Sequence, residues 1–249
     1  MTIQAVLSDV VKQCAVSGVE VIKVTATAES TLIQTFDADK TLFIEGHLND
    51  TIPEFVGEFG ITNLKMLSGL LGFASYQTDT ADFKVRSRDL NGAKVLDQFE
   101  FKGSGSKSVF KLMDVQHVPQ QAKIASIPWN VTIDEGVSKS KITEFQQFAG
   151  LYAEIDKQFS VVSEGDNLVV NFGQQASSTH SGSMTLAENI AGTIQPALTF
   201  PVDKFLMLMK LAQNAQSSKL MFTNKGLLGV ETVTNHGSYK YFLRQSVRG

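Results

Sequence analysis

The chain has 249 residues, 43% of them hydrophobic and 19% charged, so it can bury a substantial core as one large domain or two of ordinary size. Its formal charge of −3 argues against a uniformly basic nucleic-acid binder but does not say where the lysines lie. No apolar run approaches the roughly 20 residues that span a bilayer, and the N-terminus lacks the regions of a signal peptide. The single cysteine, Cys14, cannot form an internal disulfide, which fits a reducing cytoplasm.

The first half of the chain alternates between helical and strand periods. Ile3, Val6, Val10 and neighbouring apolar residues recur at helical spacing and predict a first helix, with Gly18 as its terminating residue. The later elements of this half are a second helix marked by Leu64, Leu67 and Leu71, and strands at 19–27, 31–37, 41–48, 82–88, 94–101 and 107–113.

The second half follows a polar stretch with no consistent period. Residues 113–130 contain Pro119 and Pro128 and are typical of an extended connector. Pro201 suits the first turn of a late helix, because its missing N–H would be unpaired there. The expected elements are a helix at 142–152, this helix over 201–212, strands at 131–133, 158–163, 167–172 and 184–191, a mobile Ser/Gln-rich loop at 174–183, and three terminal strands separated by turns at 224–226 and 235–237.

The two halves share the order helix, strands, helix, strands. Ile3 corresponds to Ile142 and Ile61 to Val202, so both pairs of helices recur at nearly the same spacing. This agreement predicts an internal duplication. We therefore expect an α+β protein with two similar domains, each with two helices packed on antiparallel sheet: a first domain over 1–113, a connector over 114–130 and a second domain over 131–249.

Enzyme signatures are weak in this sequence. Residues 103–108, GSGSKS, lack the spacing of a phosphate loop and do not open a helix, so a hairpin turn is favoured. The four histidines have no metal-ligand spacing. Cys14 lies on the apolar stripe of its helix, which favours an inert core thiol. We expect no catalytic residues, no metal and no cofactor.

The outward sides of the four predicted helices carry lysine. Singly, each lysine is most simply a solvated surface residue, and acids such as Asp9 and Glu144 share these helices. Four equivalent helices in a duplicated chain, each with an exposed lysine, favour a common surface for a polyanion. The candidate DNA-binding residues are Lys12, Lys65, Lys139, Lys141, Lys204 and Lys210.

In this order of elements the chain resembles the DNA sliding clamps, the processivity factors of replicative polymerases. It is most similar to the two-repeat clamps of T4-type bacteriophages and to proliferating cell nuclear antigen. The similarity covers nearly the whole chain in architecture but few positions in identity. The segments that carry it are FGITNLKMLSGLLGF at 59–73, LTFPVDKFLMLMKLA at 198–212 and KGLLGVETVTNHGSYKYFLR at 225–244.

The resemblance implies a ring of three copies that encircles duplex DNA without reading its sequence and tethers a polymerase. It also implies an ATP-dependent clamp loader as a partner, no cofactor and no membrane, and a place in the cytoplasm, that of the host if the protein is viral. Edge strands would pair between copies, here 107–113 with 184–188. The expected subunit-interface residues are Val109, Lys111, Met184 and Leu186.

Clamps bind their partners through short peptides that enter an apolar cleft under the connector. By resemblance, the cleft here would use the connector residues Val115, His117 and Val118, and Leu228, Tyr241 and Leu243 of the terminal sheet. The alternative for the last three is that they are ordinary core residues. Val118 is expected to be a connector residue that can be changed without opening the core.

Two other classes of function remain open on the sequence alone. One is a structural or virion protein that assembles through its sheet edges into tubes or sheets. The other is a small-molecule enzyme whose site forms only in three dimensions, which a pocket with clustered, shifted titratable groups would support.

Overall fold

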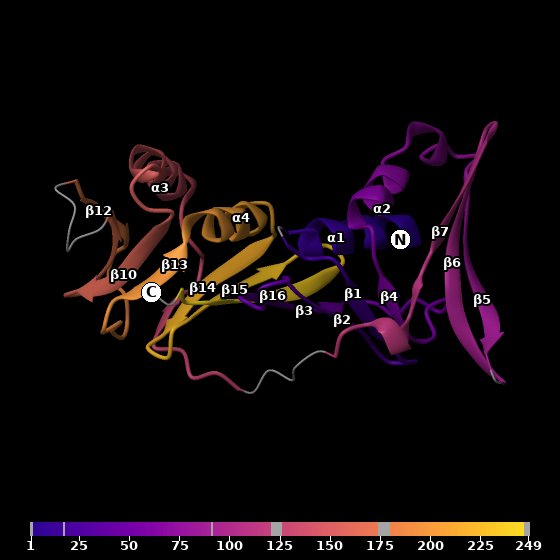
Figure 1. Ribbon diagram of the computed structural model, residues 1–249, viewed down its shortest axis with the longest axis horizontal. Helices are drawn as coiled ribbons and strands as arrows, with labels where there is room; N and C mark the ends of the chain where they lie inside the picture. The colour runs from indigo at the N-terminus through magenta and orange to yellow at the C-terminus, as the bar shows by residue number, and fades with distance from the viewer. Residues whose placement is uncertain (1, 17, 91, 121–125, 174–179, 247–249) are drawn as a thin grey trace. The chain divides into compact units, whose positions relative to one another are not determined.

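The computed structural model describes residues 2–16, 18–90, 92–120, 126–173 and 180–246 (Figure 1). The chain divides into two compact units. Unit 1 consists of Met1–Lys123 with Thr234–Tyr239, and unit 2 of Ile124–Val233 with Lys240–Gly249. Within the described residues each unit has two α-helices and antiparallel sheet, so the predicted α+β class with two similar domains is confirmed. The exact domain and connector boundaries stay predictions.

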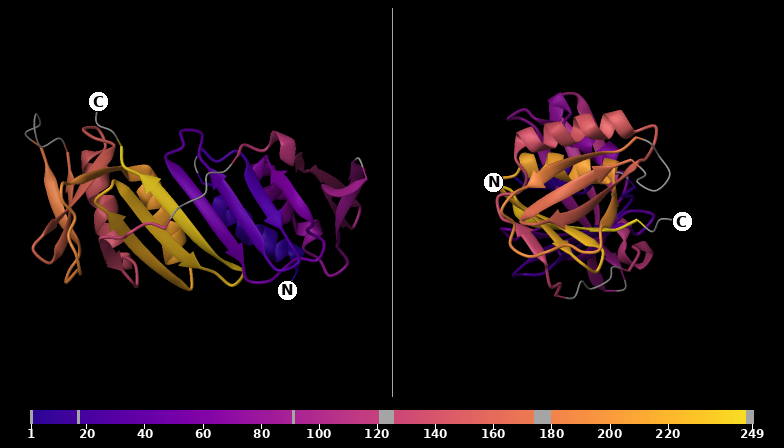
Figure 2. Two further views of the ribbon diagram at one scale, coloured as in Figure 1. Left: turned by 90° about the horizontal axis from the view of Figure 1, so that it is seen from below. Right: turned by 90° about the vertical axis from the view of Figure 1, so that its left-hand side faces the viewer.

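Unit 1 has a sheet in the order β8-β4-β1-β2-β3 and a separate sheet in the order β5-β6-β7. Figure 1 and the view from below in Figure 2 show α1 and α2 on one face of strands β1 to β4. The elements are α1 (Ile3–Cys14), β1 (Ile22–Ala26), β2 (Thr31–Phe36), β3 (Leu42–Leu48), β4 (Gly57–Ile61), α2 (Leu64–Leu71), η1 (Ala74–Tyr76), β5 (Asp82–Leu90), β6 (Ala93–Gly103), β7 (Ser106–Lys111), β8 (Met113–Asp114) and η2 (Val115–His117).

The first helix shows how the sequence determines local structure in unit 1. The Thr2 side chain caps it by accepting a hydrogen bond from the Ala5 N–H. Its apolar stripe is buried, and Cys14 at its end is fully buried. Burial raises the pKa of the Cys14 thiol, and the Asp9 carboxylate raises it further. Cys14 therefore lies in the core as a protonated thiol, as the pattern predicted.

Gly18 does not terminate this helix, which ends at Cys14 with Ala15 as its C-cap. Gly18 instead has a positive φ of 83° and lies against the β2–β3 turn, where its carbonyl accepts from the Ala38 N–H at 2.9 Å. The turn itself is organised by buried Asp37, whose carboxylate accepts from the Thr41 N–H at 2.8 Å and the Thr41 hydroxyl at 2.7 Å. The glycine is thus required for the close approach of a turn.

Unit 2 has a sheet in the order β16-β15-β14-β9 and a second sheet in the order β12-β11-β10-β13. β16 is shared: its first residues belong to unit 1 and the rest to unit 2. A cluster of rings fills the core under α3 and α4, with Phe145 and Phe205 centroids 4.7 Å apart. The elements are β9 (Val131–Ile133), α3 (Lys139–Tyr152), β10 (Gln158–Glu164), β11 (Asn167–Phe172), β12 (Gly182–Ala187), β13 (Leu198–Pro201), α4 (Val202–Gln213), β14 (Ser217–Thr223), β15 (Leu227–Val233) and β16 (Gly237–Arg244).

Several predicted elements are shifted, and three of the described strands are additional. β4 and β13 were not predicted as strands, and the start of the expected connector forms β8, which pairs with β4. Pro201 ends β13 and is the N-cap of α4, so the helix begins one residue later, at Val202. The strand expected at 184–191 is β12, Gly182–Ala187. Of the loop expected at 174–183, residues 174–179 lie outside the described residues.

The GSGSKS segment at 103–108 is the predicted hairpin turn. Gly103 pairs with Ser106 where β6 turns into β7. Gly103 is needed there because a side chain would meet the Ser75 carbonyl, 2.2 Å from the position of an added Cβ. The segment does not open a helix, so it has no phosphate-loop geometry.

Candidate functional site

The two helices of unit 1 each present an exposed lysine on the side away from the sheet. Lys12 lies in the last turn of α1 and Lys65 in the first turn of α2, and both are exposed. The buried residues of these helices, such as Val10 and Leu67, face the sheet. Because α1 and α2 lie on the same face of the sheet (Figure 1) and contact each other, their exposed sides form one surface of unit 1, and Lys12 and Lys65 belong to it.

Unit 2 repeats this arrangement. Lys139 begins α3, Lys210 lies in the last turn of α4, and both are exposed. The other two predicted lysines differ from these. Lys141 is half-buried and pairs with Glu144 at 3.1 Å, and Lys204 is also half-buried. The structure therefore brings one exposed lysine to each of the four described helices and leaves two of the six candidates less available.

The acidic residues that share these helices are largely engaged elsewhere. Within unit 1, the Asp9 carboxylate accepts from the Thr234 hydroxyl at 2.7 Å and from the Tyr239 hydroxyl at 3.2 Å. Glu144 is paired with Lys141. Asp203 is exposed but lies in the first turn of α4, where the helix dipole favours a carboxylate. Asp9 and Glu144 are thus held by their own contacts, and the exposed lysines Lys12, Lys65, Lys139 and Lys210 form none of the ion pairs found among the described residues.

Two of the lysines occupy positions that are electrostatically unfavourable for helix stability. Lys65 and Lys139 lie in the first turns of α2 and α3, and neither first turn contains an acidic residue. In α2 the N-cap Asn63 has a φ of 49° and makes no side-chain cap bond. Cations at a helix N-terminus oppose the helix dipole, so these residues add to a positive potential at some cost in stability.

The predicted subunit-interface residues lie on two strands with a free edge. Among the described residues, β7 pairs with β6 alone and β12 with β11 alone. Val109 is 39% exposed, and Lys111 is exposed and bonded to Asp97 at 2.8 Å. Met184 and Leu186 point into the core of unit 2 and are 5% and 2% exposed. A partner strand on β12 would therefore meet its backbone and not these two side chains.

Exposed apolar side chains lie beside both edges. Phe73 is 52% exposed and contacts Tyr76, whose hydroxyl bonds with that of Ser108 on β7 at 2.7 Å. Leu151 is 75% exposed and precedes Tyr152, whose ring lies close to Gly182 of β12. Large exposed apolar residues next to an unpaired strand edge are typical of a protein interface.

The predicted peptide-pocket residues differ in their accessibility. In unit 1, Val115 is half-buried and His117 exposed. Val118 is 8% exposed because it packs on Gly60 of β4, so it is not a connector residue that can be changed without disturbing the core. In unit 2, three side chains have no exposed surface, which is the core placement that the sequence left open: Leu228, Tyr241 and Leu243.

A small hollow next to the connector was not foreseen from the sequence. It has a volume of about 60 Å³ and lies where Pro119 meets the β2–β3 turn, with Phe36, Ala38 and Val21 in its wall. The Phe36 ring is half-buried and also faces the Lys40 ammonium, 5.8 Å from its centroid. The sequence feature that could have indicated this hollow is Phe36, an apolar residue at the end of a strand and next to a turn.

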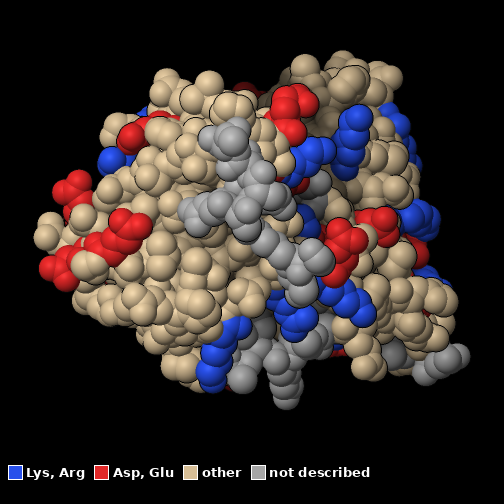
Figure 3. Space-filling model, turned by 60° about the vertical axis from the view of Figure 1, so that its left-hand side comes forward, with Lys and Arg blue, Asp and Glu red and all other residues tan. Residues whose placement is uncertain are grey.

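Other site types have little support in the described part of the chain. No group of three or more His, Cys, Asp or Glu residues there could hold a metal ion. No described helix is long and apolar enough to cross a membrane. Figure 3 shows acidic and basic groups interspersed among uncharged surface on the face in view, so charge of one sign does not dominate that face.

Comparisons with known proteins identify the fold. No family model matches the chain, and no curated protein matches it significantly. Among the solved structures that are similar to this chain, two illustrate the match over essentially their whole length. One is A. fulgidus PCNA bound to the C-terminal region of FEN-1, with TM-score 0.66, 11% identity, and coverage of 100% of this chain and 98% of that chain. The other is the proliferating cell nuclear antigen (PCNA) of Entamoeba histolytica, with TM-score 0.68, 15% identity and coverage of 98% and 96%.

The chain thus has the sliding-clamp fold, over its full length. More particularly, its two units have the fold of PCNA. This confirms, for the fold, the resemblance that was drawn from the sequence. Identities of 11% and 15% establish architecture and nothing finer.

The helix dipole separates the lysines into two groups with opposite effects on stability. Lys65→Glu in the first turn of α2 is expected to raise the free energy of unfolding by about 0.3–1 kcal/mol, and Lys210→Glu in the last turn of α4 to lower it by a similar amount. Urea denaturation of the purified variants measures both. Equal destabilisation by the two substitutions would show that Lys65 is not placed against the dipole.

Proposed function

We propose that this protein is a DNA sliding clamp: a ring that encircles duplex DNA and tethers a replicative polymerase. The observation that supports it most is the exposed lysine on each of the four described helices of a clamp fold, two in each unit. On this proposal the protein is not an enzyme. It binds DNA, and a polymerase and an ATP-dependent loader act on or through it.

The physical basis is long-range attraction between lysines and phosphates. Duplex DNA carries about one negative charge per 1.7 Å of its axis, so lysines repeated around a hole attract any sequence equally. Such contacts position a duplex without reading its bases. Sequence-independent attraction together with topological enclosure allows movement along DNA while preventing dissociation, which is what a processivity factor requires.

Ring closure in this proposal joins β7 of one copy to β12 of the next. Each of the two strands pairs on one side only among the described residues, and Phe73 and Leu151 place exposed apolar surface beside them. Pairing would satisfy the edge N–H and C=O groups and bury this apolar surface. By resemblance to two-repeat clamps, three copies close the ring and bring twelve helices to its inner surface.

The DNA-facing role of the helices is tested by replacing Lys12, Lys65, Lys139 and Lys210 together by alanine. Retention on circular DNA is expected to fall strongly and equally for unrelated sequences, because the phosphate contacts are lost and no base contacts exist. Retention of the unaltered protein should decrease as salt increases. The measurement is the fraction of clamp that stays with nicked circular DNA after loading and gel filtration.

A matched control replaces four exposed lysines that lie away from the helices: Lys84, Lys94, Lys225 and Lys240. This variant removes the same charge and should keep its DNA retention. Both variants are expected to unfold within about 0.5 kcal/mol per substitution of the unaltered protein, as is usual for surface changes. Equal retention by the helix variant and the control would contradict the assignment of the helices to DNA.

The partner site in this proposal is the start of the connector and the hollow beside it. The A. fulgidus protein was solved with the C-terminal region of FEN-1 bound, so a protein of this fold binds a peptide segment. Here the exposed candidates are His117 and Pro119 on the chain after β8, with Phe36 and Ala38 across the hollow. An apolar anchor of a partner peptide would gain most of its affinity from a few such buried contacts.

Ala38→Asp and Pro119→Asp are expected to weaken polymerase binding by roughly 2 kcal/mol each, because each adds a charge where an apolar anchor would be buried. The readout is stimulation of the cognate polymerase on a singly primed template, titrated with clamp. Val56→Asp, at a 47% exposed apolar residue of unit 1 that does not line the hollow, is the control. Normal stimulation by both hollow variants would place the docking site elsewhere.

A further inference from the structure

The exposed face of the β5–β6–β7 sheet carries two lysines that oppose each other. Lys102 on β6 and Lys107 on β7 are directly paired across the strands. Like charges at directly opposed positions destabilise a sheet. No ion pair is formed by either lysine with any residue that the structure describes, although both are exposed. Asp82 on β5 lies opposite Lys102 on its other side, so one carboxylate faces this pair of lysines across the strands.

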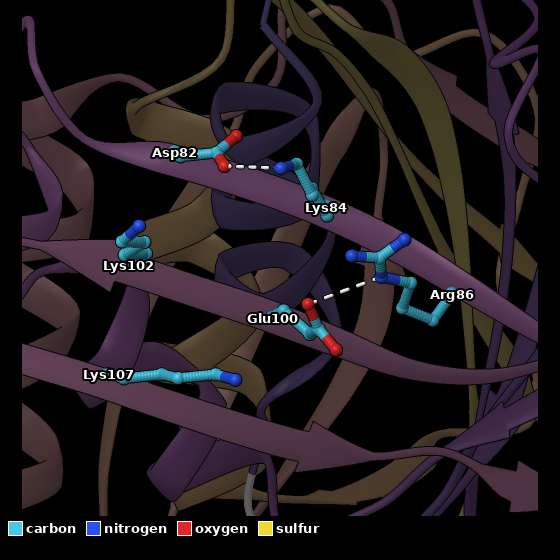
Figure 4. Close-up of a pocket in the computed structure, with 6 residues that line it drawn as sticks. All are labelled: Asp82, Lys84, Arg86, Glu100, Lys102 and Lys107. Carbon is cyan, nitrogen blue, oxygen red and sulfur yellow. Dashed lines mark hydrogen bonds and ion pairs between the residues drawn. The ribbon is translucent and has the colours of Figure 1, made fainter.

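The neighbouring charges on this face already neutralise one another. Lys84 pairs with Asp82 at 2.7 Å, and Arg86 with Glu100 at 3.2 Å, as Figure 4 shows. The Arg86 hydrogen bond lowers the pKa of Glu100 most, and the Gln98 hydrogen bond and the charges of Arg86 and Lys107 lower it further, so this carboxylate stays ionised. These groups and the two lysines line a shallow hollow of about 240 Å³. The lining holds four basic and two acidic side chains, so the face keeps an excess of positive charge, and Lys107 places part of it where β7 begins.

Unit 2 carries the opposite charge at one end of its own free edge. Glu164 and Asp166 lie at the turn between β10 and β11, and Glu188 directly follows β12. Leu168 pairs with Ala187, and the Ile190 N–H donates to the Asp166 carbonyl at 2.9 Å, so the three residues share one corner of the sheet. All three are exposed, and none forms an ion pair within the described chain.

Antiparallel pairing of the two edges brings these charges together. The start of an antiparallel strand lies opposite the end of its partner, so Lys107, near the start of β7, would lie opposite Ala187 and Glu188 at the end of β12. Parallel pairing would bring Lys111 there instead, and the Lys111 ammonium is already bonded to Asp97 at 2.8 Å. The charge pattern thus favours one direction of pairing.

We propose that Lys102 and Lys107 of one copy meet the acidic corner of Glu164, Asp166 and Glu188 of the next copy, and that this contact fixes the antiparallel direction and register of the β7–β12 joint. This inference rests on the proposed ring, and it explains which strand edges of neighbouring copies pair with each other. Two β7 edges would bring lysines together, and two β12 edges would bring carboxylates together. Like-charge contacts disfavour these pairings, so copies associate head to tail.

Reversal of one charge on each side tests this contact. Lys107→Glu and Glu188→Lys are each expected to weaken ring assembly by about tenfold or more, since each replaces an attraction by a repulsion. The variant with both changes in one chain restores opposite charges at every joint and should regain most of that loss. The assembly constant is measured by sedimentation equilibrium over a range of protein and salt concentrations.

Two charge reversals of the same kind serve as controls. Lys94→Glu lies at the hairpin end of β6, away from Lys102, and Glu135→Lys follows β9, which belongs to the other sheet of unit 2. Both residues are exposed, and assembly should be unchanged in both variants. Thermal unfolding monitored by circular dichroism checks that every variant is folded.

The outcomes separate this inference from the proposed ring. If the unaltered protein is monomeric at micromolar concentration, the ring fails and the charged joint fails with it. If the unaltered protein forms the ring and both single reversals assemble equally well, the charged joint is overturned and the ring stands. A double variant no better than the single variants would also overturn the direct contact.

Discussion

Burial of one apolar side of each helix against a sheet is the constraint on which the proposed function depends. In α1 the buried stripe includes Val6 and Val10, and in α4 it includes Phe205 and Leu208. A helix with one buried stripe has its polar side fixed by geometry, because residues recur at about 100°. Core packing therefore holds Lys12 and Lys210 on the outer surface of their units.

The second constraint is the edge strand. A sheet that ends in an unpaired strand exposes backbone donors and acceptors and tends to associate. In the described part of the chain β7 and β12 are such edges, and they differ in charge: lysines lie at the start of β7 and carboxylates at the end of β12. When the two edges of one chain differ and complement each other, copies associate head to tail. Such contacts close into a ring if the rotation per copy allows it, and otherwise form open polymers. Pairing of these two edges is therefore compatible with the proposed clamp ring and with the alternative, a structural protein that assembles into open polymers.

The sequence predicted the elements whose signal is local. The stripes of α1 and α2 and the alternating strands β14 to β16 were recognisable because burial of one side imposes a period on consecutive residues. β4 was missed because Gly57 and Gly60 weaken any strand pattern. The reason for a glycine at position 60 appears only in the structure: Val118 and Met113 pack on Gly60 and occupy the space that a side chain would need.

The part of the candidate site that follows from the helical and strand periods of the sequence was predictable. The four exposed lysines follow from the helix stripes, but the pairing of Lys141 with Glu144 does not. Alternation in β16 indicates that Tyr241 and Leu243 face an apolar environment, yet a period cannot distinguish the chain's own core from a partner peptide. The opposed lysines Lys102 and Lys107 depend on strand register, which sequence alone did not determine.

The central claim is a closed ring of three copies, and molar mass in solution tests it most directly. Light scattering coupled to size-exclusion chromatography at micromolar concentration should give three times the chain mass of 27.2 kDa, constant across the peak. A mass of one or two chains would contradict the account. A mass that grows continuously with concentration would also contradict it and would indicate open polymers built by edge pairing.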